Sequence, residues 1–104
     1  MKQFTVIVKP FRAEAVLQAA AEFGVIDLVV REVKGFSRQK GYLDLYIGSE
    51  YSLAFLPKVE IALWVEDERA DELAAKIAAV ARTGRIGDGK VLAVPSAIGE
   101  VIEF

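Results

Sequence analysis

Two alanine-rich segments with helical periodicity, residues 12–23 and 67–82, constrain the fold of this chain most strongly. In the first, Val16, Ala20 and Phe23 recur at the spacing that places them on one face of a helix. The second segment repeats that spacing. Each helix is flanked by short runs rich in β-branched residues, so the predicted order is β-α-β-β-α-β. This order is typical of the ferredoxin-like α+β class.

The remaining elements follow from a period of two and from local stop signals. Gly24 is expected to cap the first helix in a left-handed conformation, and Asp67 is expected to be the N-cap of the second. The predicted strands cover residues 3–9, 27–36, 59–65 and 91–94, and a short last strand is an alternative to coil at 100–104. With 104 residues and no linker, the chain is predicted to form one domain, residues 1–104.

The third predicted strand is apolar on both of its faces. Val59 and Ile61 point to one side, while Ala62 and Trp64 point to the other. Two helices can cover only one face of a four-stranded antiparallel sheet, so its second face would normally be polar. We therefore expect the open face to bind further copies of the chain in a closed cyclic assembly.

Residues 37–57, between the second and third strands, form a connection of about twenty residues, far longer than a hairpin needs. Tyrosines, cations and glycines make it polar and adaptable rather than core-like. Loops of this length in compact domains are usually functional. The alternative is an insertion without a role.

Composition excludes several classes of function. The chain has no Cys and no His, so thiolate metal sites, disulfides and the commonest general base are absent. We find no nucleophile paired with a base and predict no enzymatic activity. A net charge of −2 gives no electrostatic reason to expect nucleic acid as a partner. No run reaches the roughly 18 apolar residues of a membrane helix, and no signal peptide is recognisable, so the expected location is cytoplasmic.

Residues 84–90 formally match the start of a phosphate loop, Gly-x-x-x-x-Gly-Lys. Val91 follows instead of Ser or Thr, and the segment leaves a helix and enters a strand, which is the reverse of the phosphate-loop order. A nest of backbone N–H groups that binds an anion beside Lys90 is the more credible functional reading. A simple turn with a solvated Lys90 is the alternative.

Polar and charged residues flank the long connection on both sides. Arg38, Gln39 and Lys40 lie near its start and Lys58 near its end, so their side chains could converge into a cationic site for phosphates or a dicarboxylate. A charged rim that keeps the connection soluble is the competing interpretation. Trp64 fits an interface better than a ligand-stacking role.

Four blocks of sequence, residues 32–41, 45–51, 55–59 and 81–90, resemble the PII family of nitrogen-regulatory signalling proteins. The resemblance spans nearly the whole chain. It implies a homotrimer of ferredoxin-like subunits, with adenine nucleotides (ADP, AMP or ATP) bound in the clefts between neighbours. It also implies that residues 37–57 are a T-loop that engages a regulated target protein.

The same resemblance assigns roles to individual positions. The nucleotide-binding residues that it implies are Gly35, Arg38, Gly87, Asp88, Gly89 and Lys90. The residues expected at the effector site are Gln39, Lys40, Gly41 and Lys58. Gln39 would complete a magnesium site only when ATP binds, and Lys58 would hold the carboxylate of 2-oxoglutarate. Tyr51 matches a tyrosine that is uridylylated in some members.

Departures from the family pattern bear on ligand choice. Residues 101–104 replace a usual Arg-x-Arg pair, and Ala62 replaces a glutamate that usually helps to fix the adenine. Trp64 stands at a usually small position, where it would adjoin the nucleotide, and Asp27 is a candidate contact for the base or ribose. We expect ADP or AMP to bind at least as well as ATP, and 2-oxoglutarate sensing is less well supported. The alternatives are a sensor of ADP or AMP with bicarbonate, and a constitutive interaction module without ligand control.

Overall fold

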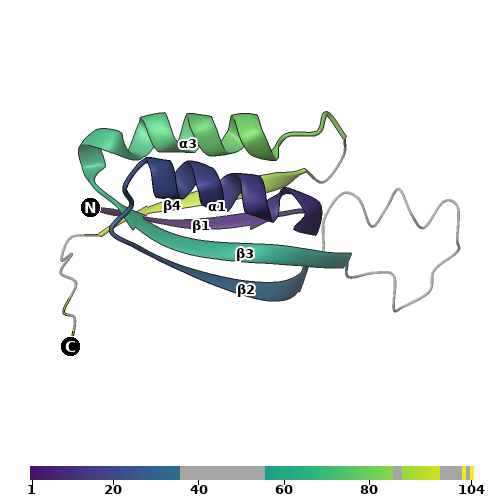
Figure 1. Ribbon diagram of the computed structural model, residues 1–104, viewed down its shortest axis with the longest axis horizontal. Coiled ribbons are helices and arrows are strands. Elements are labelled where there is room, and N and C mark those ends of the chain that lie inside the picture. Colours follow the sequence, from purple (N-terminus) through teal and green to yellow (C-terminus); the bar gives the residue numbers. More distant parts are fainter. Residues whose placement is uncertain (36–55, 86–87, 97–101, 103) are drawn as a thin grey trace, which may run out of the picture.

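The computed structural model describes residues 1–35, 56–85, 88–96, 102 and 104. These residues form an antiparallel sheet with two α-helices on one of its faces (Figure 1). In chain order the elements are β1 (Lys2–Val8), the 3-10 turn η1 (Pro10–Arg12), α1 (Ala13–Glu22), β2 (Asp27–Gly35), β3 (Leu56–Val65), α3 (Asp67–Ala81) and β4 (Gly89–Pro95). The predicted α+β order is confirmed.

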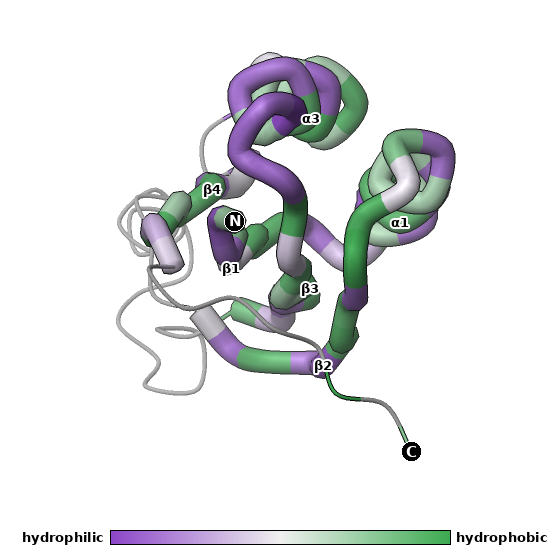
Figure 2. Tube along the Cα trace, turned by 90° about the vertical axis from the view of Figure 1, so that its left-hand side faces the viewer, coloured by the Kyte–Doolittle hydropathy of each residue, from purple (hydrophilic) through white to green (hydrophobic). Residues whose placement is uncertain are grey.

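The four strands lie in the order β2-β3-β1-β4, and every neighbouring pair is antiparallel. Val6 of β1 pairs with Ile61 of β3 on one side and with Val91 of β4 on the other. This arrangement is the ferredoxin-like topology. A view turned by a quarter rotation shows α1 and α3 on the same side of the strand layer (Figure 2).

The hydrophobic core lies between the helices and this face of the sheet. Phe4, Val6 and Val8 alternate along β1 and are almost fully buried, as the period of two requires. The other large side chains that are almost fully buried in this core are Val16 of α1, Ile61 and Leu63 of β3, and Leu73 and Ile77 of α3. The apolar stripes of both predicted helices therefore pack where the sequence placed them.

The face of the sheet that carries no helix exposes several apolar side chains. Val29 of β2 is 49% exposed, and Leu92 and Val94 of β4 are each 53% exposed. By the register, Leu92 shares this face with Thr5 of β1 and Ala62 of β3. The expectation of an apolar second face is confirmed, whereas association through it stays a prediction.

The predicted N-cap of the second helix was wrong by one residue. Glu66 occupies the N-cap position of α3, and its side chain makes no capping hydrogen bond. Asp67 is the first helical residue, and its carboxylate lies 3.0 Å from the amino group of Met1. Acidic residues in the first turn still favour the helix through its dipole.

The observed strand limits differ from the predicted ones where a strand pairs with only one adjacent strand. β3 begins at Leu56 rather than at residue 59, because it pairs with β2 beyond the point where β1 ends at Val8. Pro57 is tolerated there, since proline costs a ladder hydrogen bond only where a partner accepts it. β4 likewise begins at Gly89, opposite Val8. Most of the predicted last strand, residues 100–104, lies outside the described residues.

Gly24 has a φ of 67°, which confirms the left-handed helix end. In the described part of the chain, neither helix has both the length and the apolar character needed to cross a bilayer.

Candidate functional site

One end of the sheet brings together residues from four separate parts of the chain. Val8 at the end of β1 pairs with Val59 of β3 and with Gly89 of β4. Lys58 therefore lies beside the end of β1, and it pairs with Val33 near the end of β2. The chain enters and leaves residues 37–57 at this same end, so the predicted T-loop is rooted here (Figure 1).

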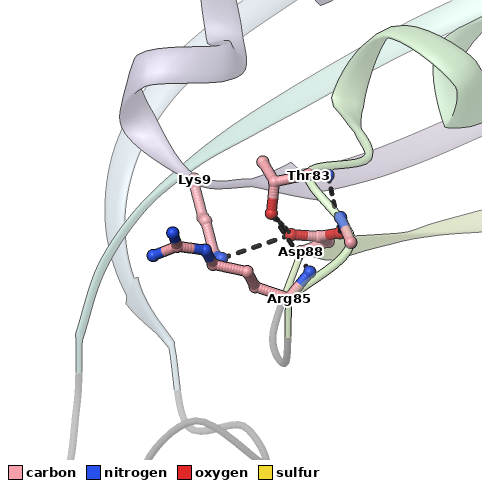
Figure 3. A network of polar contacts seen from close by, with 5 residues as sticks. Lys9, Thr83, Arg85 and Asp88 are labelled. Carbon is pink, nitrogen blue, oxygen red and sulfur yellow. Dashed lines mark hydrogen bonds and ion pairs between the residues drawn. The ribbon is translucent and has the colours of Figure 1, made fainter.

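Asp88, just before β4, organises the connection that follows α3. Its carboxylate accepts hydrogen bonds from the hydroxyl of Thr83, from the backbone N–H groups of Thr83 and Gly84 at 2.7 and 2.9 Å, and from Nζ of Lys9 at 3.2 Å. Figure 3 shows Lys9, Thr83 and Arg85 gathered around it. These donors, the Thr83 hydroxyl first, hold the pKa of Asp88 well below its usual range.

Two lysine side chains are buried at this end of the sheet. Lys9 is 8% exposed and Lys58 is 4% exposed. Burial, reinforced by repulsion from Lys9, lowers the pKa of Lys58, and attraction from Asp88 offsets part of that effect. The Asp88 carboxylate accepts hydrogen bonds from Lys9 and from the 83–84 turn, so it offsets part of the positive charge that the two lysines bring to this end of the sheet.

Two glycines allow close approach around these side chains. A Cβ atom at Gly89, whose φ is 147°, would overlap the carbonyl oxygen of Ile7. At Gly35, which ends β2, a Cβ would lie 3.1 Å from Cγ of Lys58. Both positions therefore favour glycine, the first for backbone reasons and the second because the Lys58 stem lies directly over it.

Two hollows open near this cluster. One, of about 240 Å³, lies between α3, β1 and β4 and is lined mainly by apolar side chains, with Arg82, Asp88 and Lys90 among its other lining residues. The second, of about 540 Å³, lies beside Lys58 and between Pro10 and the end of β2. Lys90 itself is exposed, so its ammonium is accessible to an anion.

Asp27 and Trp64 lie at the opposite end of the sheet. They pair with each other across β2 and β3, and the Asp27 carboxylate accepts a hydrogen bond from the N–H of Leu28 at 2.9 Å. Trp64 lies six positions after Lys58, which is about 20 Å along β3. Within one chain, the predicted base contact Asp27 is thus remote from Asp88.

The structure describes only some of the predicted site residues. Gly35, Lys58, Asp88, Gly89 and Lys90 lie at one end of the sheet, with Gly35 on one edge strand and Gly89 and Lys90 on the other, whereas Asp27 and Trp64 lie at the opposite end. The predicted site residues outside the described part of the chain are Arg38, Gln39, Lys40, Gly41, Tyr51 and Gly87. No cluster of three metal-ligating acidic side chains occurs among the residues described.

Two residues of the cluster were missed by the sequence reasoning. Lys9 is the last residue of the predicted strand 3–9, and Thr83 directly follows the predicted helical segment 67–82. A lysine directly before Pro10 and a threonine five residues before an aspartate carry no motif, so only the fold brings them to Asp88.

Comparison with known proteins identifies the family. The sequence model described as "Nitrogen regulatory protein P-II" matches residues 1–102. The chain belongs to the P-II family. It is 50% identical over 91 residues to nitrogen regulatory protein GlnK of Escherichia coli K12, a match that covers 88% of this chain and 81% of GlnK.

Nitrogen regulatory protein P-II 1 of Escherichia coli K12 and that of Salmonella typhimurium LT2 are each 48% identical over 91 residues, with the same coverage of 88% and 81%. Membership in the P-II family confirms the resemblance seen in the sequence blocks. P-II proteins are regulatory signalling proteins rather than enzymes, so the family also confirms the prediction of no enzymatic activity.

Proposed function

We propose that this P-II family protein binds an adenine nucleotide at the cluster around Asp88 and Lys90, in clefts between the subunits of a homotrimer. The bound nucleotide then sets the affinity of residues 37–57 for a target protein. One observation carries the proposal: Gly35, Lys58 and residues 88–90 lie at the end of the sheet where residues 37–57 are rooted. A ligand bound there can bias the conformation of that segment.

The charges at this end of the sheet suit a phosphate ligand. Lys9 and Lys58 are buried, and Lys90 is exposed beside them at the start of β4. The Asp88 carboxylate is occupied by internal donors, so its role is to shape the connection between α3 and β4. Phosphate contacts would therefore come from backbone N–H groups and from Lys90.

The distance between the two groups of predicted residues favours a site shared by neighbouring copies. Asp27 is about 20 Å along the sheet from Lys58 in the same chain, so it would reach the same nucleotide most simply from an adjacent subunit. The exposed Val29, Leu92 and Val94 on the open face supply apolar surface for that association.

The expected ligand preference follows from the departures at Ala62 and Trp64. We propose that ADP or AMP binds at least as well as ATP, with magnesium involved only with ATP. The target would be a transporter or a metabolic enzyme of nitrogen or carbon metabolism, met in the cytoplasm. A second effector, 2-oxoglutarate or bicarbonate, would bind near Lys58.

Calorimetric titration with AMP, ADP and ATP tests the nucleotide site, and repeating it with 2-oxoglutarate and with bicarbonate tests the second effector. We expect Lys90→Gln to weaken nucleotide binding by about tenfold, because a charge-assisted hydrogen bond contributes about 1.5 kcal/mol. Lys76→Gln, on the exposed side of α3, is the matched control. Absence of binding heat with all three nucleotides would overturn the proposal.

A further inference from the structure

The hollow of about 240 Å³ between α3 and the strands β1 and β4 has an apolar floor. Val6 and Val8 of β1 and Ile77 of α3 form this floor, and all three are almost fully buried. Val91 of β4 lies beside them and packs against the core. A molecule that enters the hollow therefore meets the hydrocarbon of the protein core.

Short side chains on both walls keep this space open. Ala74, Ala78 and Ala81 of α3 line the hollow at helical spacing, and each of these side chains ends at Cβ. Gly89 on the opposite wall has no side chain, and the carbonyl oxygen of Ile7 leaves no room for one. β4 is an edge strand with β1 as its only neighbour in the described sheet, so no described strand closes this side.

The size of the hollow suits a compact organic molecule. A closed apolar cavity of about 150 Å³ stays dry and binds benzene. At about 240 Å³, this hollow has room for a ring or a branched chain together with a short tail. Water gains few hydrogen bonds against such a floor, so an apolar ligand displaces it favourably.

Arg82 supplies a polar contact at one end of the hollow. It directly follows α3, it lines the hollow and it is exposed to solvent. Its backbone N–H donates to the carbonyl of Ala78 at 3.1 Å, which fixes where the side chain starts. Within the described residues, its guanidinium makes no ion pair. A guanidinium matches the two oxygens of a carboxylate in a bidentate arrangement.

The other charges near this end leave Arg82 as the group that selects the ligand. The Asp88 carboxylate is paired with Lys9 at 3.2 Å and accepts further internal hydrogen bonds. Lys90 alternates with Val91 along β4, so its side chain leaves the strand on the face away from the helices. The C-terminus of α3 carries about half a negative charge, which is less than the full positive charge of Arg82.

We propose that this hollow binds a small apolar carboxylate, such as an aryl-substituted or branched-chain alkanoate. Its hydrocarbon part packs against Ile77 and Val91, and its carboxylate pairs with Arg82. The site adjoins the proposed nucleotide site at residues 88–90, but it lies on the helix side of β4, whereas the side chain of Lys90 lies on the other. The inference stands whether or not a nucleotide binds.

Nuclear magnetic resonance of the full, unliganded protein with labelled methyl groups tests the site, with 3-phenylpropionate as the probe. We expect saturable shifts of the methyl signals of Ile77 and Val91, and none at Val29 and Val94 on the open face. Equal shifts in both pairs, or no saturation, would overturn the proposal. The neutral analogue 3-phenylpropionamide should bind about tenfold more weakly, because it loses a charge-assisted hydrogen bond.

Filling the hollow gives a second test. Ala78→Leu should abolish the saturable shifts, because its side chain would occupy the space of the ligand. Ala75→Leu, at an exposed position of the same helix that does not line the hollow, should bind the probe as wild type does. Thermal unfolding verifies that both variants are folded. Equal losses of binding in two folded variants would refute the assignment.

Charge variants and a competition experiment complete the test without altering the core. Arg82→Gln should weaken 3-phenylpropionate about tenfold and leave 3-phenylpropionamide unchanged. Arg85→Gln, which is exposed and does not line the hollow, should change neither. Binding of 3-phenylpropionate should persist in saturating ADP. Its loss there would place the probe in the nucleotide site, and equal affinities of wild type for the acid and the amide would exclude recognition by Arg82, so either result would overturn the proposal.

Discussion

At the scale of single residues, Asp88 has the most consequential environment in the described part of the chain. Its carboxylate receives four hydrogen bonds, three from Thr83 and Gly84 and one from Lys9, which lies 79 positions earlier in the sequence. All four favour the ionised form. The same group therefore links the shape of the proposed nucleotide site to the stability of the fold.

This environment predicts a dependence of stability on pH. The folded pKa of Asp88 lies below its ordinary value of 3.8, so its contribution to stability is complete above that pH and is lost as the pH falls further. Asp88→Asn should be less stable than wild type at neutral pH, and the difference should shrink at about pH 3. Urea unfolding at fixed protein concentration measures both. Asp71→Asn, at an exposed position of α3, should show no such convergence.

Gly89 carries a second prediction at this scale. Its φ of 147° and the nearby carbonyl oxygen of Ile7 leave no room for a side chain. Gly89→Ala should therefore lower the free energy of unfolding by about 1–3 kcal/mol. Gly24→Ala is the matched control, because Gly24 also has a positive φ but no atom lies within 4 Å of an added Cβ. Equal losses of stability in thermal unfolding would show that the contact with Ile7 has no effect.

At the scale of elements, hydrophobic periodicity predicted the features that depend on a single segment of sequence. Both helices and the alternation of β1 follow from apolar spacing, because one stripe or one face must be buried. The N-terminal limit of β3 did not follow, since residues 56–58 are in a strand only because β2 accompanies them past the end of β1. Strand pairing is a property of two segments, and a single run of sequence does not contain it.

The candidate site likewise contains residues that the sequence predicted and contacts that it did not predict. Asp88 and Lys90 were identified through the glycine-rich block, and Lys58 through its place beside the long connection. The ion pair of Lys9 with Asp88 could not be read from the sequence, because it joins residues whose proximity depends on the register of β1 with β4. Burial of Lys58 likewise depends on Gly35, which β2 brings to it.

At the scale of the whole molecule, α1 and α3 lie on one face of the sheet, and no helix among the described residues covers the other, open face (Figure 2). Leu92 and Val30 offer a matched pair for testing what that open face does. Leu92 is 53% exposed and lies on the open face beside Thr5, while Val30 is 43% exposed and lies on the helix side, opposite Ile61. Both belong to edge strands of the sheet.

Association through the open face predicts opposite results for the two variants. Leu92→Asp places a charge where apolar surface would be buried between copies, so the protein should dissociate into monomers. Val30→Asp places the same charge on the helix side and should remain assembled. Size-exclusion chromatography with light scattering, at several protein concentrations, reports the mass. If nucleotides bind between copies, Leu92→Asp should also lose nucleotide affinity in calorimetry, while Val30→Asp keeps it. A monomeric Leu92→Asp that binds ADP as wild type does would place the whole nucleotide site within one chain.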